Sequence, residues 1–126
     1  MKEIIKKFKF KSIAIIINAP FDLKKDFDEL GFLNSFLDNQ KSENTLVFVN
    51  NEEEYIYFLN NKLEKIVTDS VLWFAYPKGT SKIKTDIYRD TIRVMGELFN
   101  VTTVTAISIN ETWSALRFRP IDKVGK

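Results

Sequence analysis

Short apolar runs alternate with amphipathic stretches along this chain. The apolar runs, rich in β-branched and aromatic residues, cover residues 12–18, 45–49 and 71–76. Runs of this kind are typical of strands that are buried on both faces of a parallel sheet. Between and after them, an apolar residue recurs every three or four positions, which predicts helices within 22–38, 52–66 and 86–99.

Helix-capping residues mark the starts of these helices. Asp22, the pair 50–51 and Asp86 stand where a side-chain oxygen can accept a hydrogen bond from the first helical turn. Gly31 favours a division of the first predicted helix into two short ones. Residues 1–11 fit either a short helix or an extended lead-in, because their apolar positions are compatible with both the helical and the strand periodicity.

Two further strands are predicted within 101–109 and 113–119, joined by turn residues 110–112. A short turn between two strands makes an antiparallel hairpin. Helices that connect successive strands favour a parallel sheet between two helical layers. We therefore predict a single α/β domain over residues 1–126: a three-layer open sheet, mainly parallel with a C-terminal antiparallel hairpin, of a shortened Rossmann-like kind.

The composition narrows the chemistry that this domain can perform. The 126 residues include no cysteine and no histidine, which excludes disulfides, thiol nucleophiles, Cys/His zinc sites and Ser-His triads. The formal net charge of +2 is too small to indicate a nucleic-acid partner by itself. No apolar run approaches the roughly 20 residues of a membrane span, and the basic start lacks the apolar core of a secretory signal. We expect a cytoplasmic protein without a membrane partner.

In open α/β sheets, ligands bind at the carboxyl ends of the strands. This rule singles out loops 18–20, 50–51 and 77–85, which should share one edge of the sheet. Loop 77–85 combines lysines, a glycine and small hydroxyls before a predicted helix, and such a loop can hold an anion. A solvated basic loop is the simpler interpretation of the same residues. The candidate ligand-binding residues of these loops are Asn18, Pro77, Lys78, Gly79, Thr80, Ser81 and Lys82.

The motifs of the usual nucleotide-binding modes are missing. The four glycines of the chain are too widely separated for a G-x-G-x-x-G fingerprint or a Walker loop. The carboxylates Asp86, Asp90 and Glu111 have no partner at a spacing that suggests acid–base work, and capping, surface pairing or a turn position explains each of them. We therefore assign no catalytic residue, no metal ligand and no cofactor.

A second candidate surface lies near the C-terminus. Trp113 begins a strand of the edge type and is expected to be partly exposed. Arg117 and Arg119 alternate with apolar residues, so both lie on one face of that strand. Trp113 and Arg117 could form an exposed patch with Lys78 and Lys82, although protection of a sheet edge also explains the two arginines.

The second half of the chain contains two recognisable motifs. Residues 73–78 read Trp-Phe-Ala-Tyr-Pro-Lys, and residues 111–118 read Glu-Thr-Trp-Ser-Ala-Leu-Arg-Phe. On these motifs, residues 70–119 resemble a family of small bacterial domains of unknown function, marked by W-x-x-x-P-K and E-x-W-S-x-L-[RK]-F. The resemblance implies no activity, but it directs attention to 77–78 and 111–114, expected at the two ends of the junction between parallel and antiparallel strands. The layout is also similar to the later half of class I methyltransferases, without their glycine-rich cofactor loop.

Three functions follow, in order of preference. The first is a non-enzymatic domain that binds a protein partner or a small anionic ligand at the strand-end loops. The second is an enzyme acting on a small phosphorylated or carboxylated substrate, in which Lys78 stabilises charge and Glu111 or Tyr76 carries a proton. It requires Lys78 and Glu111 to meet across one pocket. The third, a nucleic-acid accessory protein, would use loop 77–85 with Arg117 and Arg119, and its binding would weaken steeply with salt.

Overall fold

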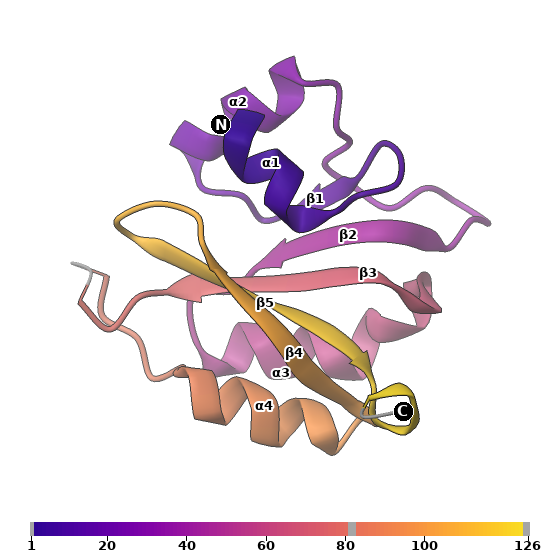
Figure 1. Ribbon diagram of the computed structural model, residues 1–126, viewed down its shortest axis with the longest axis vertical. Helices are drawn as coiled ribbons and strands as arrows, with labels where there is room; N and C mark the ends of the chain where they lie inside the picture. The colour runs from indigo at the N-terminus through magenta and orange to yellow at the C-terminus, as the bar shows by residue number, and fades with distance from the viewer. Residues whose placement is uncertain (1, 81–82, 125–126) are drawn as a thin grey trace.

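The computed structural model describes residues 2–80 and 83–124, which form a five-stranded mixed sheet with helices on both faces (Figure 1). The strands are Ile15–Ile17 (β1), Ser42–Phe48 (β2), Ile66–Pro77 (β3), Val101–Ser108 (β4) and Trp113–Pro120 (β5). The helices are Lys2–Phe8 (α1), Phe21–Glu29 (α2), Glu52–Asn61 (α3) and Arg89–Glu97 (α4), with 3-10 turns at Leu63–Lys65 (η1) and Ile121–Lys123 (η2). The strand order is β1-β2-β3-β5-β4.

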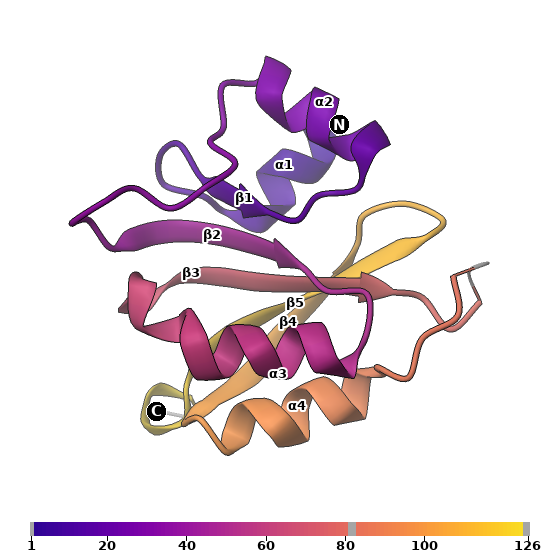
Figure 2. The same ribbon diagram turned by 180° about the vertical axis from the view of Figure 1, so that it is seen from behind.

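The helices cover the two faces of the sheet in separate pairs. α1 and α2 lie on one face, and α3 and α4 lie on the other (Figures 1 and 2). Alternate residues of β3 belong to different cores. The indole of Trp73 donates a hydrogen bond to the carbonyl of Phe8 at 2.9 Å on the α1 side. Phe74 packs edge-on against Tyr55 of α3, with ring centroids 5.0 Å apart. The predicted α/β class is therefore confirmed.

The sheet is mixed, and the predicted mainly parallel arrangement is matched in part. β1, β2 and β3 pair in parallel, but β5 inserts between β3 and β4 and runs antiparallel to both. Half of the pairings among the described strands are therefore antiparallel. Asn110 organises the turn between β4 and β5, because its Oδ1 accepts hydrogen bonds from the backbone N–H groups of Thr112 at 2.8 Å and Trp113 at 2.9 Å.

Gly31 ends α2 instead of dividing a longer helix. It adopts a φ of +87°, a left-handed conformation that a glycine takes without steric cost. The backbone N–H of Phe32 then donates to the carbonyl of Phe27 at 3.2 Å, and the two rings lie 6.3 Å apart, as in a Schellman cap. The second predicted helix does not form. Leu33 bridges instead to Ile15 at the outer edge of β1.

Two of the three predicted caps are wrong. Asp22 lies in the first turn of α2, whose start has no side-chain cap. Asn51 caps α3 as expected, since its Oδ1 accepts a hydrogen bond from the N–H of Glu54 at 2.9 Å. Asp86 does not cap α4. Its carboxylate accepts a hydrogen bond from the backbone N–H of Glu52 at 2.8 Å, at the start of α3.

β3 begins earlier than the apolar run predicts and contains an irregularity. It leaves the regular ladder with β2 between Ile66 and Val71. Asp69, at this irregularity, has a φ of +59°. Its two carboxylate oxygens accept hydrogen bonds from the guanidinium of Arg119 on β5, at 2.9 and 3.0 Å. This ion pair therefore joins the irregular start of β3 to the end of β5.

Candidate functional site

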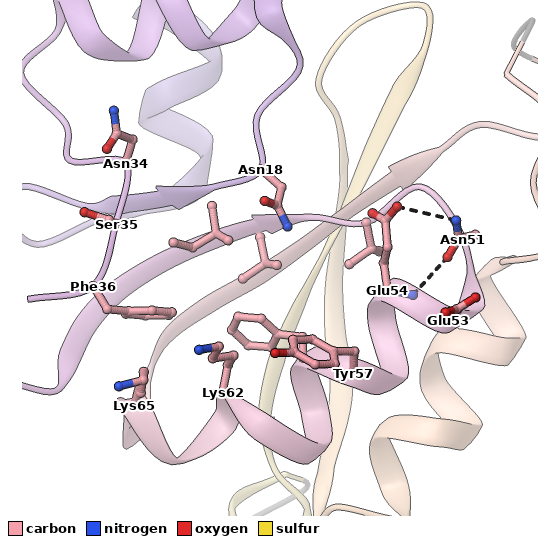
Figure 3. Close-up of a pocket in the computed structure, with 14 residues that line it drawn as sticks. Asn18, Asn34, Ser35, Phe36, Asn51, Glu53, Glu54, Tyr57, Lys62 and Lys65 are labelled. Carbon is pink, nitrogen blue, oxygen red and sulfur yellow. Dashed lines mark hydrogen bonds between the residues drawn. The ribbon is translucent and has the colours of Figure 1, made fainter.

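The loops after β1, β2 and β3 lie at one edge of the sheet, as the parallel pairing of these strands requires. The hydroxyl of Thr85 donates a hydrogen bond to the carbonyl of Asn50 at 2.7 Å, which holds the loop after β3 against the loop after β2. A cavity of about 770 Å³ opens at the ends of β1 and β2. We call it the strand-end cleft, and it is lined by Ile17, Asn18, Asn34, Ser35, Phe36, Val47, Val49, Asn51, Glu53, Glu54, Tyr57, Phe58, Lys62 and Lys65 (Figure 3).

The floor of the strand-end cleft is apolar because of strand alternation. Ile17 at the end of β1 is the register partner of Val47 on β2, and Val49 follows two positions later. All three belong to the core on the α3 side of the sheet. Their neighbours Ile16 and Phe48 point to the core on the opposite face, as the two-residue period of a strand requires.

Aromatic rings form the middle of the cleft. The rings of Phe36 and Phe58 lie 6.2 Å apart, although the two residues come from different segments. Phe58 is 4% exposed and belongs to the core, whereas Tyr57 is 58% exposed. Figure 3 shows Phe36 entering from the segment after α2, opposite the ring of Tyr57 on α3. An apolar group that enters the cleft can therefore pack against these rings.

Two lysines form one end of the cleft. Lys62 follows the last turn of α3, and the backbone N–H of Lys65 donates to the carbonyl of Lys62 at 2.9 Å. Side chains three positions apart eclipse one another in a 3-10 turn. Both lysines are half-buried, and Figure 3 shows their ammonium groups at the same end of the cavity. This end of the cleft is positively charged.

Carboxylate and amide groups form the other end. Glu54 accepts hydrogen bonds from the backbone N–H and the side-chain amide of Asn50, at 3.0 and 3.1 Å. Glu53 is exposed beside it. Asn18 has a φ of +60° at the end of β1, and its amide points into the cleft, whereas the amide of Asn34 points away from the aromatic rings (Figure 3). The two ends of the cleft thus have opposite charge.

The structure divides the sequence-predicted site residues between two places. Asn18 lies in the strand-end cleft, but Pro77 and Lys78 lie beside the turn between β4 and β5. The backbone N–H of Lys78 donates to the carbonyl of Thr112 at 2.8 Å. Its ammonium group donates to the hydroxyl of Ser108 at 2.6 Å. The motifs at 77–78 and 111–114, expected at opposite ends of the strand junction, therefore meet at the same end.

The remaining predicted residues have varied environments. Gly79, Thr80 and Glu111 are exposed, while Ser81 and Lys82 lie outside the described residues. Trp113 was expected to be partly exposed, but it is only 4% exposed. Its indole packs edge-on against Phe48 of β2, with centroids 5.1 Å apart. The buried Trp113 therefore adds little to the exposed patch predicted with Lys78, Lys82 and Arg117. Arg119, on the same strand as Arg117, is held by Asp69.

Tyr76 was a candidate proton carrier. It is half-buried at the end of β3, and this burial raises its pKa above the ordinary value of 10.0, against an opposing effect of the charge of Arg89. A phenol with a raised pKa stays protonated near neutral pH, so it is poorly suited to act as a general base.

Within residues 2–80 and 83–124, no group of three or more acidic, cysteine or histidine residues could hold a metal ion. Over the same residues, no helix is both long and apolar enough to cross a membrane.

Sequence reasoning missed most of the strand-end cleft. Glu54, Phe58, Lys62 and Lys65 follow one another at spacings of four, four and three, which places them on one face of a helix. The helix was predicted from the apolar stripe on a neighbouring face of the same segment, which gives no indication of this charged and aromatic face. The contribution of Phe36 has no comparable sequence signal, because it depends on where the segment after α2 crosses the sheet.

No protein-family model matches this chain, and no curated protein matches its sequence.

Proposed function

We propose that this protein is a non-enzymatic binding domain that holds a small anionic ligand in the strand-end cleft. The observation that carries the proposal is the pair Lys62 and Lys65, both half-buried at one end of an apolar-floored cavity of about 770 Å³. Small-molecule sites are typically clefts of about 300–1,000 Å³ with apolar walls and a few placed polar groups. The cleft also opens at the carboxyl ends of β1 and β2, where α/β sheets bind ligands.

A small ligand fits this site because the strand-end cleft is concave and the charged side chains Lys62 and Lys65 line it. The side chains of Lys62 and Lys65 are half-buried beside an apolar floor, and an anion held against such a floor is attracted to their charge more strongly than in bulk water, since the local dielectric is lower. The described residues at the site include no histidine or cysteine, and Glu54 is engaged with Asn50 and Asn51. These features favour binding over acid–base chemistry.

The two alternative functions have less support. The enzymatic one needs Lys78 and Glu111 across one pocket, but neither lines the strand-end cleft and the Lys78 ammonium is bonded to Ser108. The nucleic-acid one relies on a basic stripe, of which Arg119 is paired with Asp69.

We also propose that the fold is a shortened Rossmann-like half similar to the later part of class I methyltransferases. A helix, a strand, a second helix and an antiparallel hairpin follow β2 in that order. The chain has no glycine-rich turn, and Asn50 follows β2 where those enzymes carry an acidic residue. Similarity of fold alone therefore assigns neither a cofactor nor an activity to this chain.

A thermal-shift experiment tests the proposed binding function. Glucose 6-phosphate, AMP and benzoate are added to the full chain, to Lys62→Ala/Lys65→Ala and to Lys6→Ala/Lys7→Ala. Lys6→Ala/Lys7→Ala is the control: it also removes two positive charges, but from α1, on the opposite face of the sheet. A ligand at about 100 times its Kd stabilises by roughly 2.7 kcal/mol, which raises Tm by several degrees.

The proposal expects at least one of these anions to raise Tm of the native chain and of Lys6→Ala/Lys7→Ala, but not of Lys62→Ala/Lys65→Ala. It is wrong if no anion raises Tm. It is also wrong if the shift survives in Lys62→Ala/Lys65→Ala. In that case a further variant, Lys78→Ala, shows whether the ligand lies at the loop after β3.

A further inference from the structure

We infer that the ligand of the strand-end cleft is a nucleoside monophosphate whose base carries an exocyclic amino group. This inference rests on the proposed binding function and names the chemical class that the cleft fits. Three parts of the cleft carry it: the aromatic middle, the charge difference between its ends, and the amide of Asn18.

The aromatic middle fits a flat ring. Tyr57 projects from α3 into the cavity, while Phe36 enters from the opposite wall near the lysines (Figure 3). The ring of Phe58 lies 6.2 Å from that of Phe36, so the aromatic surface extends from the middle of the cleft toward Lys62. Tyr57 is 58% exposed although it borders an apolar floor. A heterocyclic base covers such rings by stacking, which contributes substantially to nucleotide binding and does not depend on a particular base.

The charges along α3 decide the orientation of the ligand. Many nucleotide sites place the phosphate at a helix N-terminus. Here two backbone N–H groups at the N-terminus of α3 already have acceptors. The N–H of Glu54 donates to the side chain of Asn51, and the N–H of Glu52 donates to the carboxylate of Asp86. Glu53 adds a further negative charge in the first turn. A phosphate is repelled from this end and attracted to Lys62 and Lys65 at the other end.

The length of the cleft is compatible with this orientation. Glu54 and Lys62 are eight positions apart, which corresponds to about 12 Å along a helix at about 1.5 Å per residue. An extended nucleoside monophosphate spans a comparable length between the far edge of its base and its phosphate. The phosphate can therefore reach the lysines while the base edge lies near Asn18 and Glu54.

The base edge determines which base the cleft accepts. The amide of Asn18 offers one donor group and one acceptor group, and it points into the cleft (Figure 3). Carboxylates accept hydrogen bonds but donate none when ionised, so Glu53 and Glu54 favour an amino group over a carbonyl. Adenine and cytosine present an amino group beside a ring-nitrogen acceptor, a pair that an asparagine amide can contact with both of its groups.

Isothermal titration calorimetry of the full chain tests this inference. The probes are AMP, IMP, adenosine and ribose 5-phosphate. IMP replaces the amino group of AMP with a carbonyl, while adenosine lacks the phosphate and ribose 5-phosphate lacks the base. The variants are Tyr57→Ala, Asn18→Gly, Lys62→Ala/Lys65→Ala and the control Lys6→Ala/Lys7→Ala. Glycine at position 18 removes the amide and keeps the φ of +60° available without strain.

AMP is expected to bind about tenfold or more tightly than IMP, adenosine or ribose 5-phosphate, since each lacks one of the charge-assisted or stacking contacts. Tyr57→Ala should weaken AMP about tenfold. Asn18→Gly should reduce the preference for AMP over IMP. Lys62→Ala/Lys65→Ala should weaken AMP but leave adenosine unchanged, and the α1 control should behave like the native chain.

Other results separate the two claims. Suppose that ribose 5-phosphate binds as tightly as AMP, that Tyr57→Ala has no effect, and that only the cleft lysines matter. The nucleotide assignment is then wrong, and the proposed anion-binding function stands. If IMP binds as tightly as AMP, the amino-group assignment is wrong. If none of the phosphates binds, the inference is wrong, and the proposed function then depends on whether benzoate raises Tm. If binding is insensitive to Lys62→Ala/Lys65→Ala, the proposed function fails together with the inference.

Discussion

The carboxylate of Asp86 accepts a hydrogen bond from the backbone N–H of Glu52 at 2.8 Å, across 34 positions of the chain. The neighbouring hydroxyl of Thr85 donates to the carbonyl of Asn50 at 2.7 Å. The loop after β3 thus satisfies groups at the start of α3 that this helix cannot satisfy by itself. It thereby fixes the acidic end of the strand-end cleft.

Removing this contact should destabilise the fold. Asp86→Ala is expected to lower the free energy of unfolding by about 1 kcal/mol, the usual effect of losing a side-chain cap. Asp90→Ala, which removes an exposed carboxylate from the first turn of α4, is the matched control. Urea unfolding of both variants measures the difference. Equal midpoints for the two variants would show that the contact between Asp86 and Glu52 contributes nothing.

Gly96 is predicted to be a packing requirement of α4. An added Cβ would lie 2.8 Å from a ring carbon of Phe118 and 3.1 Å from the hydroxyl of Tyr55. Crowding of a packed core costs about 1–3 kcal/mol, which exceeds the roughly 1 kcal/mol that alanine gains over glycine within a helix. Gly96→Ala should therefore lower Tm, whereas Gly79→Ala, whose Cβ meets nothing within 4 Å, should not. A Tm for Gly96→Ala at or above the native value would contradict this account.

Tyr55 should make stability depend on pH under alkaline conditions. Its hydroxyl donates to the carbonyl of Ile92 at 2.6 Å, and burial raises the pKa of the phenol above its ordinary value of 10.0. Above that pH the unfolded chain releases the proton while the folded chain retains it, so the free energy of unfolding falls as the pH rises. Tyr55→Phe should be about 1 kcal/mol less stable at pH 7 and should lose less stability between about pH 9 and 11. If the free energy of unfolding of the native chain and of Tyr55→Phe falls equally with pH over this range, the phenol of Tyr55 is not the cause of the alkaline destabilisation.

Asp69 should contribute to stability at neutral pH but not in acid. Its hydrogen bonds with Arg119 hold the pKa of the carboxyl below the ordinary value of 3.8. A lowered pKa means that the contribution is present above 3.8 and is lost as the pH falls through the lower folded-state value. Asp69→Asn should unfold at lower urea than the native chain at pH 7, with a gap that closes in acid and shrinks with salt. Asp122→Asn serves as the exposed control, and a gap that persists in acid would point to a cause other than charge.

The features predicted correctly from the sequence depend on local patterns. The apolar run at 71–76 lies in the C-terminal half of β3. The turn at 110–112 forms the hairpin because the side chain of Asn110 accepts hydrogen bonds from backbone groups two and three residues further along. The sequence did not show that β5 would insert between β3 and β4, which made the sheet mixed. Insertion next to β3 also buried Trp113 against Phe48, so the expected exposure was wrong.

The strand-end cleft could not be assembled from local patterns. Its floor required the register between Ile17 and Val47, and Phe36 reached it only because Gly31 ended α2 early. Asp86 looked like a cap for α4 because it stands just before that helix in the sequence. Its actual contact with Glu52 depends on the fold of the intervening chain.

An NMR titration tests the central claim, that the strand-end cleft is the ligand site. Amide shifts of the ¹⁵N-labelled native chain are followed as AMP is added. The account predicts saturable changes at Asn18, Phe36, Tyr57 and Lys65, with the hairpin turn near Glu111 unaffected. No saturable change, or changes centred on 78–80 and Glu111, would contradict it.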